Sequence, residues 1–234
     1  MPLSRRTLLA ASALSALTPA LALAAPSGDY RLVFLTADTT TSTSTDIATY
    51  NSFVNTEATL TGTLLPASTW AVLGSTATMN AVTNANSLCN GNSACINAPL
   101  YEVVLNPNSS VSDVLVASSL AAMFAGNISS TINALQNGNQ LYGFAVTGTN
   151  DNGTTATGNE LGASQVATGL ADSNTPPTEA GTFNLLLSNN SQPKSVYGIS
   201  GLLQSSAVPE PASAALLGVG AGLMLVMRRR RKAA

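Results

Sequence analysis

The sequence predicts an α+β fold, a single domain of mixed sheet with about two helices that spans residues 25–203 between two terminal apolar segments. The domain alternates short runs of β-branched and aromatic residues with segments whose apolar residues recur at helical spacing. Stretches of Gly, Asn, Ser and Thr separate these runs and favour turns. A length of about 180 residues is enough for one hydrophobic core.

The first elements follow from local pattern. Residues 30–36 are rich in Tyr, Val, Phe and Leu and predict the first strand. The Thr/Ser run 39–45 is expected to be a loop, after which Thr45 or Asp46 caps a helix with a regular apolar face. Gly62 is expected to end this helix.

The middle of the domain contains further candidates. Residues 69–74 predict a second strand, in which Trp70 is expected to lie in the core, with a ligand platform as the alternative. Residues 99–105 predict another strand. Residues 112–125 show apolar residues at helical spacing and predict a second helix.

The last part of the domain is expected to contain two strands, at 141–146 and 194–203, separated by loops. Asn150–Gly153 offers oxygen ligands at turn spacing, but a plain hairpin turn explains it better than a calcium loop. Residues 155–182 are rich in Gly, Thr and Asn and are expected to be loop.

Cys89 and Cys95 enclose a turn-prone spacer and are expected to form a disulfide in an oxidising compartment. Because the closed loop is small, the bridge should contribute only about 2 kcal/mol and fix the tip of a hairpin. A metal site is the weaker alternative, since two thiols need further ligands and the chain has no His. The sequence therefore predicts no metal and no cofactor.

Charge excludes one class of partner. Between residues 25 and 207 the only basic residues are Arg31 and Lys194, whereas ten residues are acidic, which gives a net charge of −8. Such a domain repels nucleic acid, and no basic patch is present to attract it.

Residues 1–24 have the three parts of an export signal. Two arginines precede an apolar segment at 8–23, and Ala22 and Ala24 form an A-x-A site for cleavage before Ala25. The arginine pair also resembles a twin-arginine signal. The sequence therefore leaves open whether the chain is exported unfolded or already folded.

The tail 208–234 follows a short linker at 204–207. Val208, Pro209, Glu210 and Pro211 precede an uncharged span at 212–227 and the basic residues Arg228, Arg229, Arg230, Arg231 and Lys232. The sixteen residues of the span would cover roughly 24 Å as a helix, close to the bilayer core. The basic cluster should stop transfer and stay in the cytoplasm.

This arrangement resembles the PEP-CTERM sorting signal of exopolysaccharide-producing Gram-negative bacteria. The resemblance implies that the membrane enzyme exosortase processes the Pro-Glu-Pro segment. It also implies that the chain uses the export machinery, is held briefly in the inner membrane, and finally reaches the cell surface or extracellular matrix.

The domain also resembles a C-type-lectin-like or endostatin-like domain, on the stretches 30–54, 69–81 and 144–154. That resemblance implies that the first and last strands pair, at Tyr30 and Val196, and that a loop face at 147–182 carries recognition. The calcium motifs of lectins are missing, so calcium-dependent sugar binding is not implied.

The expected function is a non-enzymatic one, structural or adhesive, in the exopolysaccharide layer, with the polysaccharide as a partner. Without His, no Ser-His-Asp triad can form. The alternative is a polysaccharide hydrolase, which would need a cleft with two carboxylates about 5–10 Å apart. A third reading is a sorted scaffold whose Thr/Ser surface carries glycan.

Overall fold

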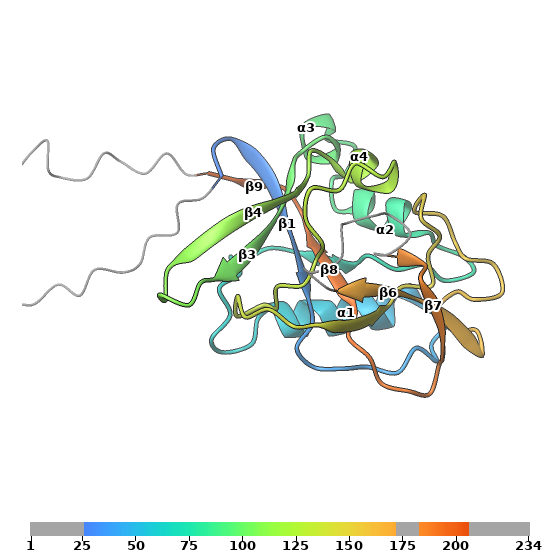
Figure 1. Cartoon of the computed structure of the whole chain (residues 1–234). Helices are drawn as coiled ribbons and strands as arrows, with labels where there is room; N and C mark the ends of the chain where they lie inside the picture. Colours follow the sequence, from blue (N-terminus) through green and yellow to red (C-terminus); the bar gives the residue numbers. More distant parts are fainter. Residues whose placement is uncertain (1–25, 172–182, 206–234) are drawn as a thin grey trace, which may run out of the picture.

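The computed structural model describes residues 26–171 and 183–205, which form an α+β fold. The predicted fold class is confirmed, but these residues form two sheets and four helices where one mixed sheet and about two helices were expected. The main sheet has the order β2-β8-β1-β3-β4 with β9 paired to β1, and the small sheet has the order β5-β6-β7 (Figure 1). The strands are Asp29–Leu35 (β1), Trp70–Val72 (β2), Leu100–Leu105 (β3), Val111–Ala117 (β4), Gly143–Val146 (β5), Gln165–Ala171 (β6), Leu186–Asn189 (β7), Tyr197–Ser200 (β8) and Leu203–Gln204 (β9). The helices of these residues are Ile47–Ala58 (α1), Ala81–Ser87 (α2), Ser93–Ile96 (α3) and Leu120–Phe124 (α4).

The central strand β1 joins the two ends of the domain. It pairs antiparallel with β8 and β9 and parallel with β3. The predicted pairing of the first and last strands is therefore confirmed, but its register differs. Tyr30 lies opposite Leu203, and Val196 accepts a hydrogen bond from the Thr36 N–H.

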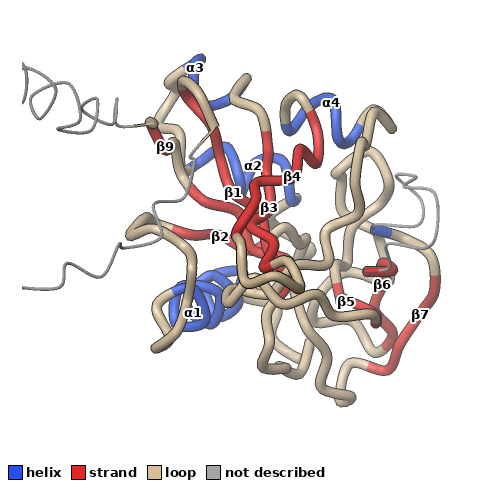
Figure 2. The backbone as a smooth tube through the Cα atoms, turned by 60° about the vertical axis from the view of Figure 1, so that its left-hand side comes forward, coloured by secondary structure: helices blue, strands red, loops and turns tan. Residues whose placement is uncertain are grey.

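Alternate residues of β1 enter two different cores, because successive side chains of a strand point to opposite faces. Val33 and Leu35 pack with residues of α2 and α4 in one core. Leu32 and Phe34 pack with residues of α1 and with Trp70 in the other. Figure 2 shows α1 and α2 on opposite sides of the main sheet. Trp70 makes an edge-on ring contact with Phe34 (5.1 Å between centroids), which confirms its place in the core.

Helix α1 begins as predicted and ends earlier than predicted. Asp46 is the N-cap, and its carboxylate accepts a hydrogen bond from the Ala48 N–H (2.9 Å). The last helical residue is Ala58, and the Thr59 hydroxyl donates to the carbonyl groups of Asn55 and Thr56 in the last turn. The predicted end at Gly62 was therefore wrong by one turn.

The helix predicted at 112–125 was wrong over its first half. Residues 111–117 form β4, an edge strand antiparallel to β3, and only Leu120–Phe124 is helical. The β-branched residues of this segment favour a strand, and pairing with β3 selects the strand over the helix. Ser119 starts α4 by accepting a hydrogen bond from the Ala122 N–H.

The loop predicted at 155–182 was wrong at 165–171, which form β6, the central strand of the small sheet. Its small residues let β6 lie buried between β5 and β7, so it lacks the large apolar residues that signal a strand. The last predicted strand, 194–203, is divided into β8 and β9.

Candidate functional site

The first and last described segments lie side by side, because β9 pairs with the start of β1. Asp29 lies opposite Gln204, and the Gln204 side chain donates a hydrogen bond to the Asp29 carboxylate (3.0 Å). Next to this pair the Ser205 N–H donates to the Gly28 carbonyl (3.1 Å), and the Gly28 N–H donates to Ser205 Oγ (3.0 Å). The ordered domain thus extends into the stretch 204–207, which the sequence predicted as a linker.

The predicted processing residues lie outside the described residues. They are Ala22, Ala24 and Ala25 at the signal cleavage site, Val208, Pro209, Glu210 and Pro211 in the sorting segment, and Arg228, Arg229, Arg230, Arg231 and Lys232 in the basic cluster. The same holds for the predicted span 212–227. Within 26–171 and 183–205, no helix is long and apolar enough to cross a membrane.

A surface hollow lies on the small sheet, with a volume of about 270 Å³. All three strands of this sheet and the segment after β7 contribute to it. We call it the small-sheet pocket, and its lining residues are Phe144, Thr168, Leu186, Leu187, Ser188, Asn189, Gln192 and Lys194.

The register of the small sheet brings the central lining residues to one face. Thr168 lies opposite Leu186 on β7 and opposite Val146 on β5. Phe144 is two residues from Val146 along β5, so its side chain points to the same face as those of Val146, Thr168 and Leu186. The Thr168 hydroxyl donates to the Leu186 carbonyl (3.0 Å), which fixes the strand edge next to the pocket.

The pocket combines apolar surface with polar groups. Phe144 is 39 % exposed, and Leu186 and Leu187 are each about half exposed, so three large apolar side chains are exposed together at this pocket. Ser188, Asn189 and Gln192 add hydroxyl and amide groups beside them. An exposed aromatic ring beside hydroxyl and amide groups can contact both the apolar face and the hydroxyls of a sugar ring.

Lys194 gives the pocket the domain's only accessible positive charge. Arg31, the other basic residue between 25 and 207, is 0 % exposed. The backbone of Lys194 is held by two hydrogen bonds with Thr40 (2.9 and 3.0 Å), and within the described part of the chain its ammonium group has no ion-pair partner. An anionic group on a bound molecule would therefore meet its complement here.

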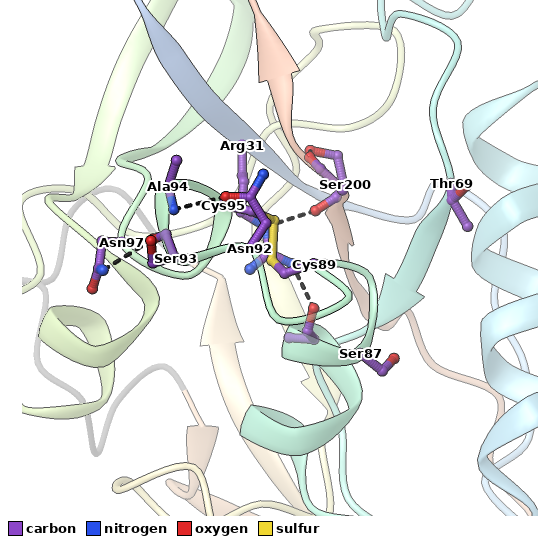
Figure 3. The surroundings of a disulfide bond; sticks show 12 residues. Arg31, Thr69, Ser87, Cys89, Asn92, Ser93, Ala94, Cys95, Asn97 and Ser200 are labelled. Atoms are coloured by element: carbon purple, nitrogen blue, oxygen red, sulfur yellow. Dashed lines mark hydrogen bonds between the residues drawn. A yellow bond between two sulfur atoms is a disulfide. The ribbon is translucent and has the colours of Figure 1, made fainter.

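Arg31 has a structural role near the disulfide, as Figure 3 shows. Its guanidinium donates to the carbonyl of Ser200 (2.8 Å) and to that of Ala85 (2.7 Å) in the last turn of α2, where the helix dipole favours a cation. Burial lowers the pKa of Arg31 to about 10, so the group is still charged at neutral pH.

The disulfide between Cys89 and Cys95 is present, and both residues are buried. Cys89 follows the end of α2 and Cys95 lies in α3. The bridge therefore closes a connection between two helices, and the predicted position at a hairpin tip was wrong. Asn92 explains the difference, because its side chain caps α3 inside the spacer.

The loop after β5 is packed into the domain. Thr147, Thr149 and Leu161 are buried, and the Leu161 N–H donates to the Ser75 carbonyl (2.8 Å). Asn150–Gly153 forms the predicted hairpin turn, closed by the Asn150 N–H to Thr154 carbonyl bond (2.8 Å). Part of the predicted loop face therefore belongs to the core, whereas Asn152, Thr154 and Thr157 are exposed.

Two glutamates are buried and bind other segments of the chain. Glu102 on β3 accepts hydrogen bonds from the N–H groups of Asn133 and Ala134 (3.1 and 3.0 Å). Glu57 on α1 accepts from the Asp38 N–H and from the Gln136 amide (both 3.0 Å). Burial raises the pKa of Glu102, and its hydrogen bonds partly offset that effect.

Among the described residues, no group of three or more His, Cys, Asp and Glu side chains is placed to hold a metal ion. One carboxylate oxygen on the main sheet, Asp113 Oδ2, is buried and has no hydrogen-bond partner among the described residues. Asp113 lies on the edge strand β4, and burial raises its pKa to about 6.

Sequence reasoning missed the small-sheet pocket. The run Leu185–Leu187 shows no alternation, so it did not indicate a strand with one exposed face. The useful signal was Lys194, because a single accessible cation in an acidic domain is a candidate for contact with a ligand.

In the sequence, a polar segment, an apolar span and a basic cluster follow the folded domain, which is the order predicted for a C-terminal sorting signal. The comparison with protein families identifies that signal, since residues 207–232 match the PEP-CTERM protein-sorting motif. The motif supports an exported protein sorted by exosortase. No curated protein matches the chain. The resemblance of the domain to C-type-lectin-like domains stays a prediction.

Proposed function

We propose that the chain is a surface or extracellular-matrix protein that exosortase processes at the Pro209–Glu210–Pro211 segment. The observation that carries this proposal is the match of residues 207–232 to the sorting motif, two residues after Ser205, the last described residue. Export would expose the disulfide to an oxidising compartment, which suits a buried Cys89–Cys95 bridge. The span 212–227 would hold the chain in the inner membrane until processing.

The proposed molecular role is adhesion to the exopolysaccharide through the small-sheet pocket. Phe144 would stack on a sugar ring, and Asn189 and Gln192 would exchange hydrogen bonds with its hydroxyls. Lys194 would pair with an acidic sugar or an acidic substituent. The acidic remainder of the domain supports this assignment, because elsewhere it would repel an acidic polysaccharide and leave the pocket as the favoured contact.

The role is proposed as non-enzymatic. Glu57 and Glu102, the two glutamates that are buried among the described residues, hold the segments around Asp38, Asn133 and Gln136. A carboxylate that accepts backbone N–H bonds in the interior is engaged in the fold, whereas a hydrolase needs its pair facing a substrate cleft.

Binding of the processed protein to purified exopolysaccharide from its own cells tests the role. Phe144→Ala and Lys194→Met should each weaken binding about ten-fold or more. Leu115→Ala is the matched control, because Leu115 on β4 is 38 % exposed, almost the same as Phe144, and is not part of the pocket. Equal losses for Phe144→Ala and Leu115→Ala would contradict the proposed site, and absence of binding by the wild type would contradict the role.

A further inference from the structure

The strand that precedes the sorting motif is held by fewer contacts than the strand before it. β8 pairs with β1 and with β2, and all four of its residues are buried. β9 has two residues, pairs with β1 alone, and leaves Gln204 exposed and Leu203 half-buried. Local opening should therefore release β9 and stop at β8, because segments with few buried contacts open first.

When β9 is paired with β1, only a short stretch of chain connects the domain to the segment that the enzyme must bind. Ser205, the last residue bonded to the start of the domain, is three residues from Val208. Three residues span at most about 11 Å. An enzyme that holds residues 208–211 in an extended form must surround the peptide, and a connection this short requires the enzyme to approach within about 11 Å of the folded domain.

Opening of β9 removes this obstacle. Gly201, which donates to the Thr69 carbonyl (2.9 Å), is the next residue held by the domain. From Gly201 to Val208 the chain has seven steps, which reach about 25 Å when extended. The enzyme can then bind the sorting segment while β8 keeps the domain folded.

We infer that β9 is a latch, which consists of Leu203–Ser205 paired with Gly28–Tyr30, and that it must open before exosortase can cut the sorting segment. The inference rests on the proposed function, since it needs the chain to be an exosortase substrate. In the closed state at most three residues separate the sorting segment from the part of the chain that is paired with the domain. The rate of processing then depends on how often β9 leaves β1.

A cross-strand disulfide locks the latch. Asp29 and Gln204 are paired residues whose side chains already touch, so Asp29→Cys with Gln204→Cys has suitable geometry for a bridge. In the full-length chain, pulse-labelled in its own cells, this variant should be processed at least ten-fold more slowly than the wild type. Reduction with dithiothreitol should restore the rate. Peptide mapping of the variant before reduction should show that the Cys89–Cys95 bridge is intact.

Two further variants separate locking from misfolding. Eight Gly/Ser residues inserted between Ser206 and Ala207 of the locked chain should restore processing, because the enzyme then reaches the segment with β9 closed. Ser205→Pro removes the N–H that donates to Gly28 and should be processed at least twice as fast as the wild type.

Two results would overturn the latch alone: a locked chain cut at the wild-type rate, or a locked chain that the spacer does not restore. A wild-type chain that is never cut would overturn the proposed sorting function, and the latch with it. Intact-mass measurement of the labelled protein distinguishes these cases, because it reports directly whether residues 228–232 are still attached.

Discussion

Replacement of Glu102 tests whether the buried carboxylate holds the domain together. Glu102 is 1 % exposed and accepts the N–H groups of Asn133 and Ala134 through one carboxylate oxygen. Hydrogen bonds to a charged group contribute about 1.5–3 kcal/mol each, and a buried N–H without a partner is costly. Removal of a desolvated charge offsets part of that loss. We expect Glu102→Ala to lower the free energy of unfolding by about 3–4 kcal/mol.

Glu102→Gln is the matched control. Its amide oxygen can accept the same two N–H groups, and its NH₂ group can donate to Ser130 Oγ, which lies near the other carboxylate oxygen. The loss should then be about 1 kcal/mol. For a domain of this size the two variants should lower Tm by roughly 10 °C and roughly 3 °C.

Denaturant unfolding of the processed protein at several pH values completes the assay. Because burial raises the folded-state pKa of Glu102 above 4.5, the folded state binds more protons than the unfolded state in the window above pH 4.5. Stability of the wild type should therefore fall as pH rises through that window, and the loss caused by Glu102→Gln should shrink. A loss below 1 kcal/mol for Glu102→Ala, or equal losses for the two variants, would refute this reasoning.

Three further predictions concern the disulfide, the edge strand and the tail. Replacing Cys89 and Cys95 together by Ala should lower the free energy of unfolding by about 2 kcal/mol, because the closed loop is short; failure to fold would show a larger role. Asp113→Asn should remove a loss of wild-type stability between about pH 4 and pH 7, of about 1–2 kcal/mol after allowance for its partial exposure, measured by denaturant unfolding; an unchanged pH profile would contradict the raised pKa. Glu210→Ala should leave uncut protein in the inner membrane, whereas Ser at residues 228–232 should release uncut protein; fractionation with an antibody to the domain tells them apart, and normal processing of Glu210→Ala would count against recognition of that residue.

The fold class, the central strand and the start of α1 could be predicted because local chemistry decides them. The apolar run of β1 is buried on both faces, and Asp46 caps a helix through its own side chain. The strand β4 could not be predicted in this way. Its residues fit a helix as well as a strand, and pairing with β3, whose position is set by the whole sheet, selects the strand.

The small-sheet pocket depends on tertiary arrangement even more than β4 does. Phe144 and Leu186 are more than 40 residues apart in sequence, and only the register of β5, β6 and β7 brings them to one face. The sorting signal is the opposite case. Its order of polar segment, apolar span and basic cluster is contained in 27 consecutive residues, so the sequence alone predicts it and the family comparison confirms it.

The most direct test of the account is the intact mass of the protein isolated from its own cells. Removal of the export signal and processing of the sorting segment predict a chain that begins at Ala25 and lacks residues 228–232. The same sample should be recovered from the cell surface or the extracellular matrix. A mature chain that begins at Ala25 but retains residues 228–232 in the inner membrane would contradict processing, and the tail would then act as an anchor alone.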